Sequence, residues 1–475
     1  MLTIRTRAAY GAGGAVYAVK EAAYTMFVLL FYTQVLGLNG SLTGAVIAIS
    51  LVWDALSDPL TGVLSDRLRS RHGRRHPFMV ASLLPIGLGF LGLFAPPPSL
   101  ASSQWALAGW LLFWSLWVRT FVTLFAIPHL ALSAEITSDY HERSQVLGAR
   151  LATLFLFSVL VPALALTFIF PERGGEDGRF DPTNYPLYGI LCCAVCWVMA
   201  AATTIGTRRY ARSSLGESRL PQSAPRLADL WRDLTRTLHN RTFRLILGQE
   251  VAIMAAYGTV ATLNMLVWTY YWEFSAGEVS LILALPSLLA VALVLLTLRP
   301  LGRRFEKHQL MQLSIIGLIV NCLWLYPLRM TGLLPPNGTT VVFVLNFLFM
   351  LCFMYCFLLR AIQTQSLVAD VTDEHEHDHG LRQEAGFFSA ANLVNKFATV
   401  FGPLYGGIVL DVVGLQASMR PGSVPEPVLD GLAWAFGIGT LPGFVIALLL
   451  VLRINLGRAR VAEIQAALRA RKAAP

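Results

Sequence analysis

Long apolar stretches alternate with short polar breaks along the whole chain. Each apolar stretch has about 20 residues or more, enough for an α-helix to cross a hydrocarbon core roughly 30 Å thick. A transmembrane β-barrel would instead show shorter segments of alternating polarity. We therefore predict an all-α polytopic membrane protein. The expected helices occupy residues 14–37, 41–65, 78–97, 104–134, 147–170, 185–206, 244–272, 278–298, 310–331, 340–368, 385–412 and 430–453.

One polar segment divides these twelve helices into two sets of six. Residues 207–243 follow the sixth helix and are rich in arginine, serine and proline. We predict an N-terminal six-helix bundle at 1–206, a cytoplasmic linker at 207–243, a C-terminal six-helix bundle at 244–453 and a cytoplasmic basic tail at 454–475. The tail is interpreted as a solvated end, and the alternative is an amphipathic helix on the membrane surface.

Composition agrees with a membrane protein and explains the net charge. The 475 residues are 55% hydrophobic and 14% charged, whereas a soluble domain is nearer a quarter charged. The net charge of +9 comes from basic residues in the loops on one side of the predicted helices. Basic loops face the cytoplasm, so both termini are assigned there and no nucleic-acid partner is expected. All six cysteines fall within apolar stretches, which predicts neither a disulfide framework nor a metal site.

Two aspartates interrupt the second apolar stretch, in the segment LVWDALSDPLTGVLSDRLRSRHGRRHPF. Asp54 and Asp58 are four residues apart and therefore share one face of a helix. An ionised aspartate at the bilayer centre costs on the order of 3 kcal/mol. A bound Na⁺, a proton or a basic side chain of a neighbouring helix would compensate this charge. The pair predicts either a cation site built from hard oxygen ligands or a static salt bridge that locks helices together.

Several segments resemble one known family. The stretch WDALSDPLTGVLSDRLRSRHGRRHP resembles the second helix and following loop of the glycoside–pentoside–hexuronide cation symporters, a family of the major facilitator superfamily. The resemblance continues in YGAGGAVY, FYTQVLGL, IPHLALSAEITSDYHERSQ, LVADVTDE, GLRQEAGFF and NLVNKF. It implies the major facilitator fold, with twelve transmembrane helices in two six-helix bundles and substrate near the midplane. It also implies an integral plasma-membrane protein, and the alanine- and arginine-rich composition suggests a bacterial inner membrane.

The resemblance assigns candidate residues to the cation and the substrate. It implies a cation site made of Asp54, Asp58, Ser57 and Thr123, with Na⁺ or H⁺ as the coupling ion and no other cofactor. Lys396 matches a family lysine, which implies that its charge balances one of the aspartates, and it is also a candidate substrate residue. Tyr17 replaces a sugar-binding residue of the family, and Lys20 and Glu21 follow one turn later, where they bind substrate or pair with other helices. The remaining candidate substrate residues are Arg150, which lies near a family arginine, and Ala126 and Leu130, which replace a sugar-binding aspartate and tryptophan.

Charged residues at the cytoplasmic ends of helices form a candidate gate. The resemblance implies that this network holds one face of the protein closed, whereas the alternative is simple membrane topology. Its candidate members are Asp66, Arg67, Arg74, Arg75, Glu142 and Arg143. Arg119, Glu250 and Arg360 are ionisable residues within apolar spans and are therefore further functional candidates. The alternative for Arg119 and Arg360 is that they extend from helix ends towards water.

Two further motifs have alternative interpretations. The histidines of DEHEHDHG at 373–380 alternate and would share one side of an extended loop, as a metal site needs, but a family hinge is expected there. The motif WTYYW at 268–272 is interpreted as an aromatic belt at the membrane interface, and the alternative is the lining of a substrate pocket.

These observations predict a secondary active transporter that carries a sugar or glycoside together with Na⁺ or H⁺ by alternating access. The alternative is a Na⁺-coupled lysophospholipid symporter, because the apolar Ala126 and Leu130 suit an acyl chain. A remote alternative is a membrane-embedded phosphotransferase. Such enzymes use D-x-x-D-G-x-x-A-R, whereas this chain has D-x-x-x-D-P without the Ala-Arg pair, so we expect no catalytic residues. The expected partners are a small-molecule substrate and membrane lipid.

Overall fold

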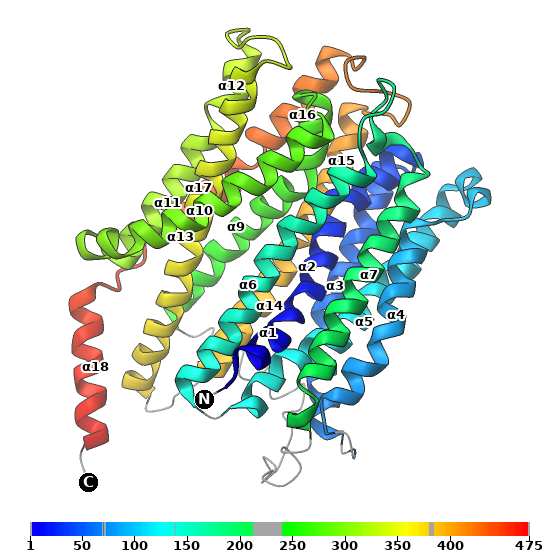
Figure 1. The fold of residues 1–475 in the computed structure, drawn as a ribbon. Helices are drawn as coiled ribbons and strands as arrows, with labels where there is room; N and C mark the ends of the chain where they lie inside the picture. The colour runs from blue at the N-terminus through cyan, green and yellow to red at the C-terminus, as the bar shows by residue number, and fades with distance from the viewer. Residues whose placement is uncertain are drawn as a thin grey trace. The chain divides into compact units, whose positions relative to one another are not determined.

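The computed structural model describes residues 2–68, 70, 73–137, 139–211, 240–379 and 384–473. Within these residues, twelve helical segments are long and apolar enough to cross a membrane, which confirms the predicted number (Figure 1). Two of them differ clearly from their predicted bounds. The first begins at Ile4 rather than at residue 14, and the tenth continues to His377 rather than ending at 368. The central linker at 212–239 and the loop residues Arg69 and Arg71 lie outside the described residues.

In the first half, the spans are α1 to α7, of which α1 and α2 share one span. Their bounds are Ile4–Ala12 (α1), Gly14–Ala22 (α2), Gly40–Arg67 (α3), His76–Phe94 (α4), Gln104–Ile136 (α5), Tyr140–Leu164 (α6) and Asn184–Gly206 (α7). Short π- and 3₁₀-helical segments continue or connect them. These are Ala23–Val28 (η1), Phe31–Val35 (η2), Pro98–Ser102 (η3), Ala165–Ile169 (η4), Gly178–Phe180 (η5) and Arg208–Ala211 (η6).

The second half has the remaining six spans and one further helix at the end of the chain. Their bounds are Arg241–Leu266 (α9) with Val267–Tyr271 (η8), Ala276–Arg304 (α10), Lys307–Cys322 (α11), Leu325–Met330 (α12), Thr340–His379 (α13), Glu384–Thr399 (α14), Phe401–Val413 (α15), Glu426–Gly437 (α16), Leu441–Val451 (α17) and Arg458–Ala473 (α18).

Contacts divide the chain into two compact units. The first unit holds the described residues up to 211 together with Ser275–Ser280 and Pro403–Val424. The second unit holds the other described residues from 240 onward. The bundle boundaries at 206, 207–243 and 244–453 remain a prediction.

Glycines in the first span allow three helices to approach closely. A Cβ atom at Gly13 would lie 2.5 Å from Nε2 of His129 on α5, and one at Gly14 would lie 2.3 Å from the carbonyl oxygen of Arg150 on α6. His129 is fully buried and stacks on Tyr10 with ring centroids 4.4 Å apart. The YGAGGAVY segment therefore fixes α2, and with it Lys20 and Glu21, against the rest of the first unit.

The first and seventh spans end in the same way, which supports an internal repeat. The amide of Leu36 donates to the carbonyl of Phe31 at 3.0 Å, and that of Trp272 donates to the carbonyl of Val267 at 3.0 Å. The next residue takes a positive φ in both halves, 73° at Gly37 and 53° at Glu273. Of the described residues other than glycine, only Glu273 has a positive φ.

The local interpretations of two motifs are wrong. The DEHEH histidines lie on α13, and a helix places residues i and i+2 about 200° apart, so the proposed single-sided arrangement does not form. The WTYYW side chains are not an interfacial belt, because Trp268, Tyr270, Tyr271 and Trp272 are all buried. Their ring neighbours include Tyr326 of the same unit.

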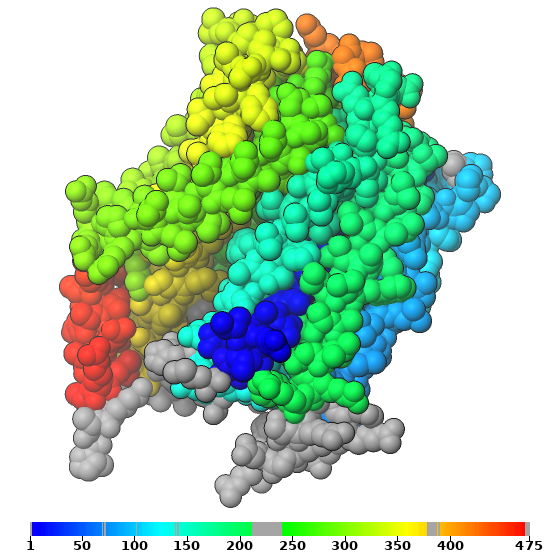
Figure 2. Space-filling model, in the orientation of Figure 1, coloured from blue at the N-terminus to red at the C-terminus, as the bar shows by residue number. Residues whose placement is uncertain are grey.

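The basic tail is not simply solvated, because it forms α18 and packs on α13 (Figure 2). Ile464 and Leu468, four residues apart, are buried. The side-chain amide of Gln465 donates to Asp373 at 3.2 Å, and Arg458 donates to the carbonyl of Gly302 at 2.7 Å. The red α18 therefore belongs to the second unit, beside the ochre end of α13 (Figures 1 and 2).

Candidate functional site

The polar face of α3 is the framework of the candidate site. Exposed apolar side chains follow one stripe of this helix at Ile49, Trp53, Leu56, Leu60 and Leu64. The buried polar side chains follow another stripe. They are Ser50, Asp54, Ser57, Thr61 and Ser65. The helix is thus apolar outside and polar inside, which is the arrangement that a lipid environment favours. Asp54 is 3% exposed, whereas Asp58 is half-buried.

Lys20 compensates the charge of Asp54 from the neighbouring helix α2. Its Nζ lies 3.0 Å from Oδ2 of Asp54 and 3.1 Å from Oε1 of Glu21. Its Nζ also lies 4.3 Å from the ring centroid of Tyr17. Lys20 is 1% exposed, whereas 40% of the Glu21 side chain is exposed. Lys20 therefore joins two carboxylates, and Glu21 remains accessible from one side.

Arg119 on α5 is a second cationic partner of Asp54. Its Nη1 lies 3.5 Å from Oδ2 of Asp54, and its Nε donates to Oγ of Ser50 at 2.9 Å. Its guanidinium lies 4.3 Å from the ring centroid of Tyr24. The side chain is 2% exposed, so the interpretation of Arg119 as a residue reaching towards water is wrong. Its position in the middle of the 33-residue helix Gln104–Ile136 is the sequence signal for a buried role.

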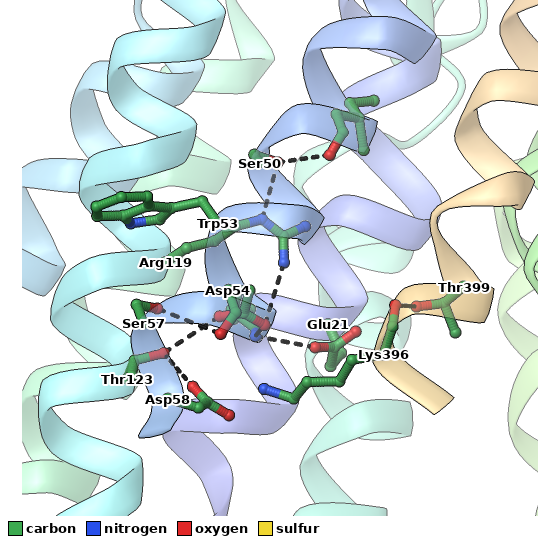
Figure 3. Close-up of polar contacts among 12 residues, drawn as sticks. Glu21, Ser50, Trp53, Asp54, Ser57, Asp58, Arg119, Thr123, Lys396 and Thr399 are labelled. Atoms are coloured by element: carbon green, nitrogen blue, oxygen red, sulfur yellow. Dashed lines mark hydrogen bonds and ion pairs between the residues drawn. The ribbon is translucent and has the colours of Figure 1, made fainter. Parts of the chain in front are cut away.

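Thr123 connects the two aspartates one turn further along α5. Its Oγ1 lies 3.2 Å from Oδ1 of Asp54 and 2.9 Å from Oδ1 of Asp58 (Figure 3). A hydroxyl has one proton, so it donates to one carboxylate at a time. The hydroxyl of Ser57 donates instead to the main-chain carbonyl of Asp54 at 3.3 Å. The structure therefore brings together Asp54, Asp58 and Thr123 of the predicted cation site. Ser57 directly precedes Asp58 on α3, but its hydroxyl bonds to the main chain.

The local charges explain how Asp54 remains buried in an apolar region. Removing a carboxylate from water costs several kcal/mol, and close cations with good geometry offset much of that cost. Lys20 and Arg119 both lie on the Oδ2 side of Asp54, and Thr123 lies on its Oδ1 side. Asp54 is thus held by three side chains from two helices.

The other predicted substrate residues lie in different surroundings. On α5, Ala126 is 8% exposed and Leu130 is 43% exposed. Arg150 is half-buried on α6, and its Nε is buried without a hydrogen-bond partner among the described residues. Lys396 is half-buried on α14 in the second unit, and its predicted role stays a prediction.

Three of the predicted gating residues, Asp66, Arg74 and Arg75, form one network with Glu135. The network lies at the C-terminal end of α3. Arg75 pairs with Asp66 and lies 3.3 Å from Oε1 of Glu135, and its Nη1 donates to Oγ of Ser65 at 2.6 Å. Arg74 reaches the same oxygen of Glu135 at 3.0 Å. This network joins α3, the residues before α4, and the end of α5.

The other predicted gating residues lie outside this network. Glu142 accepts hydrogen bonds from the amide of Leu2 at 2.8 Å and from Thr137 at 3.0 Å. The side chains of Arg67 and Arg143 are exposed. The gating role of the whole set remains a prediction.

A second buried ion pair lies in the second unit. Arg360 on α13 is fully buried and pairs with Glu250 on α9 at 2.5 Å. Gln249 donates to the same carboxylate at 2.9 Å, and Arg360 lies 3.3 Å from Oγ1 of Thr364. The interpretation of Arg360 as a residue reaching towards water is therefore also wrong. The pair joins α9 to α13.

Comparison with known proteins identifies the family. The model of the MFS/sugar transport protein family matches residues 9–458, nearly the whole chain. The chain belongs to this family. The match confirms the resemblance seen in the sequence, and the major facilitator fold is confirmed by solved structures. The structure of a point mutant of the nucleoside transporter NupG has a TM-score of 0.66 at 13% identity and covers 95% of this chain and 99% of its own.

Other MFS relatives cover different shares of the chain. An uncharacterized symporter of Synechocystis sp. is 23% identical over 99% of this chain and 97% of its own length. The putative glycoside/cation symporter YagG of Escherichia coli is 26% identical over 88% of this chain and 85% of its own. A sodium-dependent lysophosphatidylcholine symporter of Danio rerio is 30% identical, but over only 34% of this chain and 29% of its own. The D-xylose–proton symporter structure has a TM-score of 0.63 at 12% identity, covering 95% and 96% of the two chains.

Proposed function

We propose that this membrane transporter carries a glycoside together with a monovalent cation by alternating access. The observation that carries the proposal is the hydroxyl of Thr123 between the carboxylates of Asp54 and Asp58. These oxygens are hard ligands of the type that Na⁺ prefers, and carboxylates can also take a proton. The similarity to a putative glycoside/cation symporter over 88% of this chain supports the same function.

The two aspartates have different parts in this proposal. Asp54 is nearly inaccessible and is held by Lys20, Arg119 and Thr123, so its charge is matched within the protein. Asp58 is more exposed and bonds to Thr123, so an arriving cation reaches it more easily. Asp58 and Thr123 therefore provide the exchangeable part of the site, and Asp54 provides its fixed part.

Glu21 is the proposed contact for the sugar. Its carboxylate is partly exposed and is oriented by Lys20, whereas Lys20 and Arg119 are themselves almost fully buried against carboxylates. An accessible carboxylate accepts hydrogen bonds from hydroxyl groups and disfavours an anionic ligand. This arrangement favours a neutral glycoside over a substrate with an acidic group near Glu21.

A lysophospholipid is the second candidate substrate. The sodium-dependent lysophosphatidylcholine symporter shares 30% identity with 34% of this chain. Leu130 is apolar and 43% exposed, and an exposed apolar side chain suits an acyl chain better than a sugar. The glycoside remains the first choice, because its relative matches most of the chain and Glu21 suits hydroxyl groups.

The proposal includes the place of the protein in the cell. We infer an integral protein of a bacterial inner membrane with both termini in the cytoplasm, since the basic loops and the basic tail gather on one side of the spans. The chain acts as a transporter and not as an enzyme in this proposal. Its partners are the small-molecule substrate, the coupling ion and lipid.

Transport in proteoliposomes tests this function. Uptake of ²²Na⁺ and of protons is measured against a panel of glycosides and lysophosphatidylcholine, for the natural protein and for Asp58→Asn. We expect a glycoside to stimulate cation entry, and Asp58→Asn to abolish that stimulation. Glu463→Gln is the matched control, because Glu463 is exposed on α18 far along the chain from the site. Normal cation-driven accumulation by both Asp54→Asn and Asp58→Asn would show that these aspartates have only a structural role.

A further inference from the structure

A carboxylate from the second half of the sequence binds the start of the helix that carries Asp54 and Asp58. Oδ1 of Asp411 on α15 accepts a hydrogen bond from the amide of Gly40 at 2.9 Å, and Oδ2 accepts one from the amide of Ser41 at 2.8 Å. The hydroxyl of Ser41 also donates to Oδ2. These amides are the first of α3 and have no partner within that helix, and the helix dipole favours a negative charge there.

Small residues bring the two helices into direct backbone contact at the same place. A Cβ atom at Gly44 would lie 2.2 Å from the carbonyl oxygen of Pro403. One at Gly407 would lie 2.3 Å from the carbonyl oxygen of Gly40. Close packing of this kind is typical of membrane helices that meet through small residues. Any larger side chain at Gly44 or Gly407 would push α3 and α15 apart.

A further contact extends this surface to the chain that follows α15. The guanidinium of Arg420 lies 4.9 Å from the ring centroid of Phe180 in η5. The start of α3 is itself fixed to α5, because Gln104 accepts from the amide of Asn39 and donates to the carbonyl of Gly37, both at 2.8 Å. Asp411 therefore binds a rigid partner. All these residues belong to the first compact unit.

We propose that Asp411, Ser41 and the glycines Gly40, Gly44 and Gly407 form an outer latch. In the proposed orientation they lie at the outer end of α3, opposite the network of Arg75 and Glu135. Pro403–Val424 lies within the second six-helix set in sequence, between the middle of its fifth span and the start of its sixth, but belongs to the first compact unit. Alternating access requires that such contacts separate when the outer side opens. The latch closes the outer end, and its release exposes the amides of Gly40 and Ser41 to water.

The hydrogen bonds of the latch set how often the outer end opens. Hydrogen bonds to an ionised carboxylate are stronger than those between neutral groups. Asp411→Asn keeps the size of the side chain but loses its charge and one of its two acceptor oxygens. Gly44→Val adds a side chain where the backbone of α15 already lies. Both substitutions should shift the protein towards an outward-open state.

Labelling of a buried cysteine tests the latch. Thr43→Cys places a thiol on α3 at a fully buried position, and its reaction with a membrane-impermeant maleimide is followed from the outside of intact cells. We expect Asp411→Asn to raise the labelling rate roughly tenfold or more, the effect of one charge-assisted hydrogen bond. Gly44→Val should raise it at least as much. Glu426→Gln, an exposed outer carboxylate at the start of α16, is the matched control and should leave the rate unchanged.

The labelling experiment has a background control and a substitute variant. Protein without the Thr43→Cys substitution gives the background from the natural cysteines, of which Cys352 is exposed. If Asp411→Asn does not yield folded protein by size-exclusion chromatography, Ser41→Ala removes one donor and should give a smaller rise. The latch is overturned if both Asp411→Asn and Gly44→Val are labelled at the rate of the Thr43→Cys parent protein. Where Ser41→Ala is used in place of Asp411→Asn, a rate equal to the parent in Ser41→Ala has the same meaning. The assay needs neither substrate nor coupling ion, so its outcome does not depend on the proposed function.

Discussion

Asp54 illustrates how a single buried charge organises its surroundings. Two cationic side chains and one hydroxyl hold its carboxylate, and each comes from a helix next to α3. Charges in an apolar region are retained only when they are paired and hydrogen-bonded. The same residue therefore determines where α2 and α5 must lie. Asp58, one turn away and more exposed, can take a different part in transport.

The backbone conformation of Glu273 is unfavourable for an L-residue. It takes φ 53° at the end of η8, where the matching residue of the first half is Gly37. An L-residue in this conformation costs about 1–2 kcal/mol relative to a right-handed one. We expect Glu273→Gly to stabilise the protein by about 1 kcal/mol, because glycine adopts this φ without a Cβ clash. Thermal unfolding in detergent measures the effect.

Gly37 supplies the control for this prediction. Gly37→Ala introduces a Cβ atom at the equivalent position of the first half and should destabilise the protein by a similar amount. An unfolding temperature that falls with Glu273→Gly would show that the exposed carboxylate makes an interaction more valuable than the relief of backbone strain.

At the scale of the elements, buried ion pairs join helices in each half. In the second unit, Glu250 and Arg360 join α9 to α13. Removing one partner leaves an uncompensated buried charge, which typically costs about 3–5 kcal/mol. We expect Glu250→Gln and Arg360→Met to lower stability strongly, and the combination Glu250→Gln with Arg360→Met to be less harmful than the sum of the two. A double-mutant cycle of thermal unfolding measures this coupling.

An exposed ion pair on α18 is the control for the loss of stability expected at the buried pair. Arg460 and Glu463 form an exposed ion pair at 2.9 Å on α18. Exposed pairs contribute little to stability, so the equivalent substitutions there should have almost no effect. Additive effects at Glu250 and Arg360 would mean that each residue stabilises the protein through other neighbours.

The elements also show which local interpretations a sequence supports. The twelve spans are predictable because a bilayer requires long apolar helices, whose length the sequence displays directly. The burial of Arg119 and Arg360 is not predictable in this way, because a long flexible side chain allows either burial or extension towards water. The same holds for the WTYYW aromatics, since tertiary contacts with Tyr326 and not the sequence determine their burial.

At the scale of the whole molecule, the coupling ion should stabilise the folded protein. A ligand that binds only the native state adds about 2.7 kcal/mol of stability at one hundred times its dissociation constant. We expect Na⁺, or a proton if that is the coupling ion, to raise the temperature of unfolding relative to choline at equal ionic strength. Asp58→Asn should remove the effect. An equal response in the variant would mean that the ion acts elsewhere or through general screening.

The fold and the core of the site could both be predicted, but for different reasons. The fold follows from hydrophobicity and from family motifs that span both halves. Asp54, Asp58 and Thr123 stand out because charges and hydroxyls are rare in apolar spans, and the structure does place them together. Arg119 belongs to the same cluster although no family motif contains it; its place within an apolar span is a signal in the sequence, but only the structure shows that it contacts Asp54. Asp411 is separated from Gly40 by most of the chain, and no periodic pattern links the two.

Helix α3 also carries a constraint on its own length. Gly40 and Ser41 meet Asp411 at one end of it, and Asp54 and Asp58 meet Thr123 further along the same uninterrupted helix. One inserted or deleted residue between these points would rotate one set relative to the other by about 100° and shift it by about 1.5 Å. No loop lies between them to absorb the change. The spacing from Gly40 to Asp58 is therefore a fixed register, and relatives that use both sets of contacts must vary in length elsewhere.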